Sequence, residues 1–195
     1  GPTPHLTRWM DPSCGTGMFL IAALKALFQI YQDQPALARE IDGPLTHHIV
    51  NHQLYGLDWD PAAVWMSRYL LAAKASELEP EAPPLQPHTL NHLMWGDGLE
   101  AQAPELAGCD QPLPHEFPGW EMVARPSLVG GTAEFQVVLG NPPFLSETRR
   151  QKELFHTLRQ QSPIAEWMSP KTDLAHLFLI QGFLNLSAGG YLAMV

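Results

Sequence analysis

The sequence of 195 residues has few cysteines, no long apolar run and no leader-like pattern, and each shortage argues against a class of protein. Its only cysteines, Cys14 and Cys109, cannot form a disulfide framework, so we expect a cytoplasmic protein kept under reducing conditions. No stretch of about eighteen consecutive apolar residues is present, so no membrane span is expected. We find no basic segment followed by an apolar one, the pattern of a secretion leader, so secretion is not expected. The hydrophobic content of 45% is still enough for the core of one domain.

Basic residues are also scarce. The chain has 11 Lys and Arg against 20 Asp and Glu, and the resulting net charge of −9 argues against a free-standing nucleic-acid binder. The acidity is uneven, because residues 1–140 carry a balance of −10 and residues 141–195 a balance of +1. Basic groups in the second part could meet phosphates, although solvated helix charges are the simpler interpretation of any single one.

The most informative stretch is residues 135–144, which read Phe-Gln-Val-Val-Leu-Gly-Asn-Pro-Pro-Phe. The apolar, β-branched part predicts a buried parallel strand that stops at Asn141, because the prolines that follow cannot donate to a sheet ladder. In an open α/β sheet, ligands sit at this end of a strand. The Asn141 side-chain oxygen and the Pro142 carbonyl can both accept hydrogen bonds from one exocyclic amine, which makes its nitrogen nucleophilic. Phe144 offers a face on which a flipped base can stack.

A glycine turn lies near the amino terminus, in the block Asp11-Pro-Ser-Cys-Gly-Thr-Gly-Met-Phe-Leu20. A short segment from Leu6 to Met10 precedes it and helix-forming residues 21–31 follow, so the expected layout is strand, turn and helix. Gly15 and Gly17 let the backbone turn sharply and approach a ligand, at which the helix amino terminus points free N–H groups. The block lacks the Gly-Lys-Ser/Thr of a triphosphate loop, and the dinucleotide pattern G-x-G-x-x-G is absent too.

An acidic residue follows the second expected strand, residues 53–57. Asp58 occupies the position that holds ribose hydroxyls in Rossmann-like folds. Trp59 could cover an adenine face or could belong to the core. Asp60 and Pro61 are typical of a helix N-cap and first helical position.

A third strand is expected near residues 90–95, and it leads into Gly96-Asp97-Gly98-Leu99. Asp97 could accept a hydrogen bond from an adenine amino group, and Leu99 could pack on the ring. An aspartate in a glycine turn is also common turn chemistry, so this block alone is weak evidence.

The rest of the chain divides into helices, a last strand and irregular segments. We expect an amphipathic helix over residues 62–75, with Val64, Tyr69 and Leu70 among its packing residues. We expect a buried helix over residues 172–186, which Ala188-Gly189-Gly190 would end before a strand at 191–195. Further expectations are a proline-rich linker at 76–92, a long loop insertion at 101–134 and a charged helix at 148–161.

Two side-chain types invite a chemical interpretation that the sequence does not favour. His48 and His52 have helical i, i+4 spacing, but no third ligand with a motif's spacing accompanies them, so no metal site is expected. Cys14 has no obvious base partner, and we expect it to pack within the loop rather than to act as a nucleophile.

The order of these blocks resembles that of the gamma-class N6-adenine DNA methyltransferases, as found in Type I and Type IIG restriction–modification systems. The Asp11–Leu20 block looks like their first motif, and Gly140-Asn-Pro-Pro-Phe144 looks like their catalytic motif. Tyr55-Gly-Leu-Asp58 and Gly96-Asp97 look like the other cofactor positions. Leu177-Phe178 and Gly189-Gly-Tyr-Leu192 look like the helix and strand that come next. The resemblance implies a Rossmann-like, doubly wound and mostly parallel sheet with S-adenosylmethionine as methyl donor.

The resemblance also implies a role for individual residues. Asp58 would bind the ribose, Asp97 the adenine amino group of the cofactor, and the Asp11–Gly17 loop its methionine end. Asn141 and Pro142 would hold the target N6 while Phe144 stacks on the flipped base, and the methyl would pass directly to nitrogen. The implied cofactor-binding residues are Asp11, Pro12, Ser13, Cys14, Gly15, Thr16, Gly17, Phe19, Asp58, Trp59, Asp97, Gly98, Leu99 and Asn141. The implied catalytic residues are Asn141, Pro142, Pro143 and Phe144.

Other features depart from that family and leave alternatives open. Only ten residues precede Asp11, and the sequence ends inside the fifth expected strand, so we expect a catalytic-core fragment that methylates DNA weakly or not at all. DNA affinity would then lie in parts outside it, with a specificity or nuclease domain or subunit as a possible partner. An RNA guanine-N2 methyltransferase, a protein glutamine N5-methyltransferase and an inert cofactor-binding scaffold subunit are the alternatives.

Overall fold

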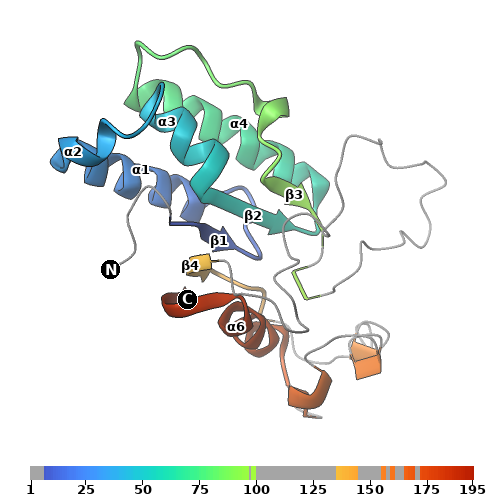
Figure 1. The fold of residues 1–195 in the computed structure, drawn as a ribbon. Helices are drawn as coiled ribbons and strands as arrows, with labels where there is room; N and C mark the ends of the chain where they lie inside the picture. Colours follow the sequence, from blue (N-terminus) through green and yellow to red (C-terminus); the bar gives the residue numbers. More distant parts are fainter. Residues whose placement is uncertain are drawn as a thin grey trace.

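The computed structural model describes residues 7–96, 98–99, 135–144, 155–156, 159–160, 165–169 and 172–195. These residues contain one sheet of five parallel strands with helices on its faces (Figure 1). The strands are β1 (Trp9–Asp11), β2 (Leu54–Asp58), β3 (Leu93–Trp95), β4 (Phe135–Gly140) and β5 (Leu186–Met194). This arrangement confirms the expected Rossmann-like, doubly wound parallel sheet.

The order of the strands across the sheet is β3-β2-β1-β4-β5. In the middle of the sheet, Trp9 of β1 lies opposite Leu54 of β2 on one side and opposite Val137 of β4 on the other. The chain therefore winds outward from β1 to β3 and later adds β4 and β5 on the opposite side. In this fold class, ligands bind at the carboxyl ends of the strands where such a reversal occurs, here β1 and β4.

Helices cover both faces of the sheet (Figure 1). One face carries α1 (Met18–Asp33), α3 (Leu45–His48), the π-helical turn η2 (Ile49–Gln53) and α4 (Pro61–Leu78). The other face carries α6 (Leu174–Leu184), which packs on β4 and β5. The shorter elements are α2 (Pro35–Ala38), η3 (Pro87–Thr89) and η5 (Ala165–Trp167).

The core lies on both faces of the sheet because successive strand side chains alternate between them. Leu54 and Leu93 point into the cluster formed with α1 and α4, where Leu24 is fully buried. Tyr55 and Met94 belong to a second cluster on the opposite face. The strands are therefore held from two sides, and their carboxyl ends are fixed relative to one another.

Two helices begin at an aspartate that caps them. The Asp60 side chain accepts a hydrogen bond from the backbone N–H of Ala62 at 2.9 Å, and Pro61 is the first residue of α4, as the sequence predicts. Asp173 accepts from the N–H of His176 at 2.9 Å in the same way and begins α6.

The boundary between the last helix and the last strand differs from the expected one. Helix α6 ends at Leu184, and β5 begins at Leu186, so Ala188, Gly189 and Gly190 lie inside the strand instead of ending the helix. Gly189 adopts a φ of 78°, and the pairing of β4 with β5 shifts register between Phe135 and Val137. The glycines thus allow an irregularity in a paired strand, which sequence patterns confuse with a chain break.

Helix α4 also differs from expectation. It continues to Leu78, inside the segment expected to be a linker, of which residues 87–89 form η3. Val64 is buried as expected, but Tyr69 and Leu70 are exposed, and the buried positions include Arg68. The Arg68 guanidinium is buried because its Nε donates a hydrogen bond to the Leu93 carbonyl at 3.0 Å, which ties α4 to β3.

Two expected segments fall largely outside the residues that the structure describes. The insertion at 101–134 lies outside them, as does most of the charged helix at 148–161. Within the described ranges, no helix is long and apolar enough to cross a membrane.

Candidate functional site

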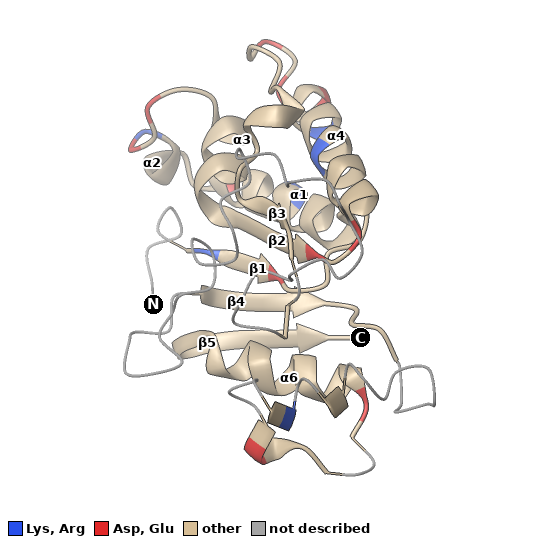
Figure 2. Ribbon diagram, turned by 90° about the vertical axis from the view of Figure 1, so that its right-hand side faces the viewer, with Lys and Arg blue, Asp and Glu red and all other residues tan. Residues whose placement is uncertain are grey.

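The carboxyl edge of the sheet gathers the side chains that the sequence singles out. Asp11 ends β1, Asp58 ends β2, Asn141 follows β4, and Gly98 follows β3. Figure 2 shows acidic residues at the tips of β1 and β2, which are adjacent strands. Residues from four chain segments therefore meet at one edge, next to the point where the strand order reverses between β1 and β4.

The turn after β1 is held by the end of β2. The backbone N–H of Gly15 donates to Asp58 Oδ2 at 2.8 Å, and the N–H of Cys14 donates to the Leu57 carbonyl at 2.7 Å. The other carboxylate oxygen of Asp58 accepts from the N–H of Asp60 at 2.9 Å. Two backbone donors thus orient the Asp58 carboxylate, and each of its oxygens keeps acceptor capacity for a further donor.

Asp11 is a buried carboxyl group with an unusual affinity for protons. Its side chain is fully buried, and Oδ1 accepts from the N–H of Ser13 at 3.0 Å. Burial raises the pKa of Asp11 to about 7; the Ser13 N–H lowers it, and the nearby Asp58 charge raises it further. Among the described residues, Asp11 Oδ2 and the Ser13 hydroxyl have no hydrogen-bond partner. Two buried polar atoms beside the loop are therefore available to a ligand or to water.

Glycines allow the loops to approach one another this closely. A Cβ on Gly140 would lie 2.6 Å from Asp11 Oδ1, and one on Gly98 would lie 2.3 Å from the Pro12 carbonyl oxygen. Gly17 adopts a φ of 83°, and a Cβ there would lie 2.8 Å from Ser67 Cβ in α4. The sequence pointed to Gly17 and Gly98, but the contact between Gly140 and Asp11 was missed because it joins distant parts of the chain.

The expected cofactor loop is neither wholly buried nor wholly open. Cys14 is buried in the core beside Gly56, and burial raises the pKa of its thiol well above the ordinary value. This agrees with a packing role and opposes a nucleophilic one. Asp11, Pro12, Cys14 and Gly17 are buried, Ser13, Gly15 and Phe19 are half-buried, and Thr16 is exposed.

The residues after β4 lie at the carboxyl edge of the sheet, and most of them are exposed. Asn141 and Pro143 are exposed, Pro142 is buried, and the Phe144 side chain is 69% exposed. The Gly140 carbonyl accepts from the N–H of Val195 at 3.1 Å, which extends the pairing with β5 up to the asparagine. Phe144 is therefore not a core residue, and its ring is accessible for stacking.

The loops after β2 and β3 are joined by an indole. Trp59 is 76% exposed, so it does not belong to the core, and its carbonyl accepts from Trp95 Nε1 at 2.7 Å. Asp97 lies outside the described residues. Leu99 is buried in a cluster with Phe178 of α6, which leaves little of its side chain for a cofactor.

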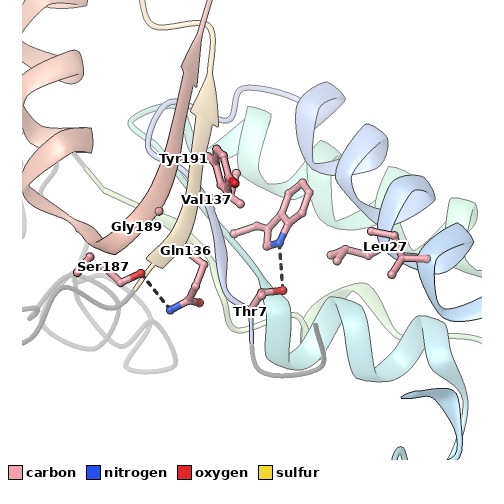
Figure 3. A pocket seen from close by; sticks show the side chains of 11 residues that line it. Thr7, Leu27, Gln136, Val137, Ser187, Gly189 and Tyr191 are labelled. Carbon is pink, nitrogen blue, oxygen red and sulfur yellow. Dashed lines mark hydrogen bonds between the residues drawn. The ribbon is translucent and has the colours of Figure 1, made fainter. Parts of the chain in front are cut away.

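A pocket of about 740 Å³ lies elsewhere, at the amino ends of β4 and β5 beside α1 (Figure 3). Thr7 and Gln136 contribute polar groups to its wall, and Figure 3 shows the hydrogen bond from Gln136 to Ser187 at 3.3 Å. It is lined mainly by apolar and small residues and does not touch the candidate site.

In the part of the chain that the structure covers, no group of three or more His, Cys, Asp or Glu side chains could hold a metal ion.

Residues 52–195 match a family model, described as Eco57I restriction-modification methylase. No curated protein matches the chain in sequence.

Solved structures of similar fold include three large proteins. The ATP-dependent Type ISP restriction-modification enzyme LlaBIII bound to DNA is 16% identical, with a TM-score of 0.50 over 79% of this chain and 10% of its own. The DrdV–DNA complex, solved by cryo-electron microscopy, is 15% identical, with a TM-score of 0.55 over 93% of this chain and 16% of its own. A nuclease-deletion mutant of the Type ISP restriction-modification enzyme LlaGI, in complex with a DNA substrate mimic, is 19% identical. Its TM-score is 0.53 over 96% of this chain and 15% of its own. The chain thus corresponds to a small part of each of these proteins, and the likeness shows the fold.

Proposed function

The chain belongs to the Eco57I restriction-modification methylase family, and we propose that it transfers a methyl group from S-adenosylmethionine to the exocyclic N6 of adenine in DNA. The observation that best supports this is the meeting, at one sheet edge, of a pre-oriented Asp58 and the Asn141–Pro142 pair. Gly140 brings the end of β4 close to the end of β1, because a Cβ on it would lie 2.6 Å from Asp11 Oδ1.

The residues at this edge suit the chemical groups of S-adenosylmethionine. Asp58 has acceptor capacity left for ribose hydroxyls, and the exposed Trp59 ring could cover an adenine. The unpartnered Asp11 Oδ2 and Ser13 hydroxyl suit the polar methionine end. Gly17 at the start of α1 supplies no side-chain cap, so the helix amino terminus is open to a carboxylate. When bound, this cofactor supplies an electrophilic methyl group on a sulfonium.

The work of the chain is then to position and activate the target amine. Asn141 Oδ1 and the Pro142 carbonyl accept hydrogen bonds from the two N–H groups of N6, which directs the nitrogen lone pair out of conjugation. Phe144 stacks on the flipped base, a contact worth about 1–3 kcal/mol, and Pro143 keeps the loop rigid. Asp97 and Gly98 complete the cofactor side in this proposal, whereas the buried Leu99 packs in the cluster with Phe178.

The partner of this site is DNA, held mainly by protein outside residues 1–195. The net charge of −9 opposes strong phosphate binding by the chain alone, whereas residues 141–195 carry a balance of +1. We propose that a specificity or nuclease domain or subunit accompanies the methylase, in the cytoplasm. The proline-rich segment at 76–92 and the insertion at 101–134 belong to the methylase core in this proposal.

A methyl-transfer assay tests the function. The protein, together with the specificity or nuclease part that we propose accompanies it, is incubated with labelled S-adenosylmethionine and, in separate reactions, with DNA, RNA and protein. The product is identified by mass spectrometry of the digested acceptor. We expect N6-methyladenine in DNA and at least a hundredfold loss of rate, roughly the effect of one transition-state hydrogen-bond acceptor, in Asn141→Ala. Asn51→Ala, the same substitution on η2 at the opposite edge of the sheet, is the control.

Each of the other outcomes points to a specific alternative. Methylated guanine in RNA or methylated glutamine in protein would replace the proposed substrate. Cofactor binding without transfer to any acceptor, unchanged in Asn141→Ala, would favour the scaffold subunit.

A further inference from the structure

The loops after β2 and β3 are linked by a side chain that the proposed chemistry does not use. Trp95 is the last residue of β3 and pairs in register with Asp58, the last residue of β2. Its indole N–H donates to the Trp59 carbonyl at 2.7 Å, one residue beyond the strand. The ladder itself continues through the Gly96 N–H, which donates to the Asp58 carbonyl at 2.9 Å. Backbone and indole thus hold the end of β2 at two successive carbonyls.

The Trp59 carbonyl lies in the middle of the turn that orients Asp58. On one side of it is the Asp58 carboxylate, and on the other is the Asp60 N–H that donates to that carboxylate. The same carboxylate accepts from Gly15 in the turn after β1. A single hydrogen bond from Trp95 therefore restrains the peptide on which the geometry of three loops depends.

The exposed Trp59 ring depends on the same restraint. With 76% of its surface exposed, this side chain has little packing of its own to fix its direction. Its backbone is held by the indole of Trp95, a residue that packs against the buried cluster on the α1 and α4 face. The backbone that carries this exposed side chain is thus tied to a residue that packs against the core.

We propose that Trp95 is a positioning residue of the cofactor site, where it holds Asp58 and Trp59 in the arrangement that receives the adenosine part of the cofactor. This role rests on the proposed function, and Trp95 itself touches neither the cofactor nor the reacting atoms. The ring of Trp95 would be replaceable by any large apolar side chain. The N–H would not, because tryptophan alone combines a large apolar body with a donor at this reach.

The test is Trp95→Phe, which keeps an aromatic ring and removes the donor. The control is Trp167→Phe on η5, which makes the same change at a tryptophan that is 55% exposed. Titration calorimetry gives the Kd for S-adenosylmethionine, and steady-state kinetics give KM and kcat. We expect Kd and KM to rise by about three- to tenfold in Trp95→Phe, the net effect of one hydrogen bond, with kcat and the melting temperature close to wild type. A purely structural role would lower the melting temperature without this separation of KM from kcat.

A second readout needs no cofactor. Hydrogen exchange of the Asp60 amide, followed by NMR in the free protein, should be faster in Trp95→Phe than in wild type and in Trp167→Phe. In the wild-type protein, the Trp95 indole N–H should exchange more slowly than the indole N–H of the exposed Trp59. This last comparison applies even if Trp95→Phe does not fold.

The outcomes separate this inference from the function on which it rests. An unchanged Kd together with unchanged exchange in Trp95→Phe would overturn the role of Trp95 and leave the methylase proposal standing. A wild-type protein that binds no S-adenosylmethionine would overturn the methylase proposal, and with it the cofactor role of Trp95. Indole exchange at Trp95 as fast as at Trp59 would show that the hydrogen bond does not hold the turn.

Discussion

Replacing Asp11 by asparagine should make the protein more stable at neutral pH and leave its stability near pH 4 almost unchanged. Asp11 is fully buried, and burial raises its pKa from an ordinary 3.8 to about 7. Asparagine has nearly the same shape, keeps an oxygen that can accept from the Ser13 N–H, and cannot ionise. The substitution therefore isolates the ionisation of one buried group.

The sign and size of the effect follow from proton linkage. The folded state binds the Asp11 proton more tightly than the unfolded state, so the stability contributed by this group is complete below pH 3.8 and is lost as the pH rises towards 7. A difference of about 3 between the two pKa values corresponds to at most roughly 4 kcal/mol. The stability of Asp11→Asn should lack this dependence on pH. The difference in unfolding free energy between the variant and wild type should therefore grow between these two pH values and then level off.

Urea unfolding at a series of pH values measures the effect. Asp33→Asn, which removes an exposed carboxylate at the end of α1, controls for the change in net charge. If the free energies of unfolding of wild type and Asp11→Asn ran parallel from about pH 4 to about pH 8, Asp11 would titrate alike in both states, and the reasoning from its burial would be wrong.

Three further predictions concern packing and capping, and unfolding by urea measures each of them. Gly140→Ala should destabilise the folded protein by about 1–3 kcal/mol because the new Cβ would lie 2.6 Å from Asp11 Oδ1. The control Gly96→Ala should have a smaller effect, because its nearest contact would be at an ordinary 3.4 Å. Asp173→Ala should reduce stability by about 1 kcal/mol through loss of the cap of α6, and no change would show that another group replaces the cap. Leu24→Ala should cost about 2–5 kcal/mol because Leu24 is fully buried between α1 and the sheet, and a loss under 1 kcal/mol would mean that the core collapses around the gap.

Much of the fold was predictable because strands and caps are local signals. The run before Asp58, the Asp60–Pro61 start of α4 and the stop at Asn141 each follow from a few neighbouring residues, and the structure confirms them. The packing face of α4 was not predictable in this way. Tyr69 is apolar enough to suggest burial, whereas Arg68 is buried only because the Leu93 carbonyl of another element accepts its hydrogen bond.

The candidate site likewise has features that local sequence predicts and features that depend on contacts between distant segments. Chain order places Asp11, Asp58 and Asn141 at the ends of strands, so their shared edge follows from topology once the sheet is parallel. The raised pKa of Asp11 and the contact between Asp11 and Gly140 depend on how distant segments of the chain meet at this edge. No pattern within a single segment carries that information, and for the same reason the hydrogen bond of Trp95 was missed.

The placement of β1 at the centre of the sheet has a consequence for how the site assembles during folding. Strands β1 to β3 join neighbours that follow along the chain, whereas the pairing of Trp9 with Val137 joins residues 128 positions apart. Closing so long a loop is slow compared with local pairing, so the half of the sheet that holds Asp58 can form before the half that holds Asn141. A fluctuation that detaches β4 and β5 would then separate the residues proposed to bind the target amine from those proposed to bind the nucleoside, without unfolding either half. The two halves of the proposed site would come together only late in folding.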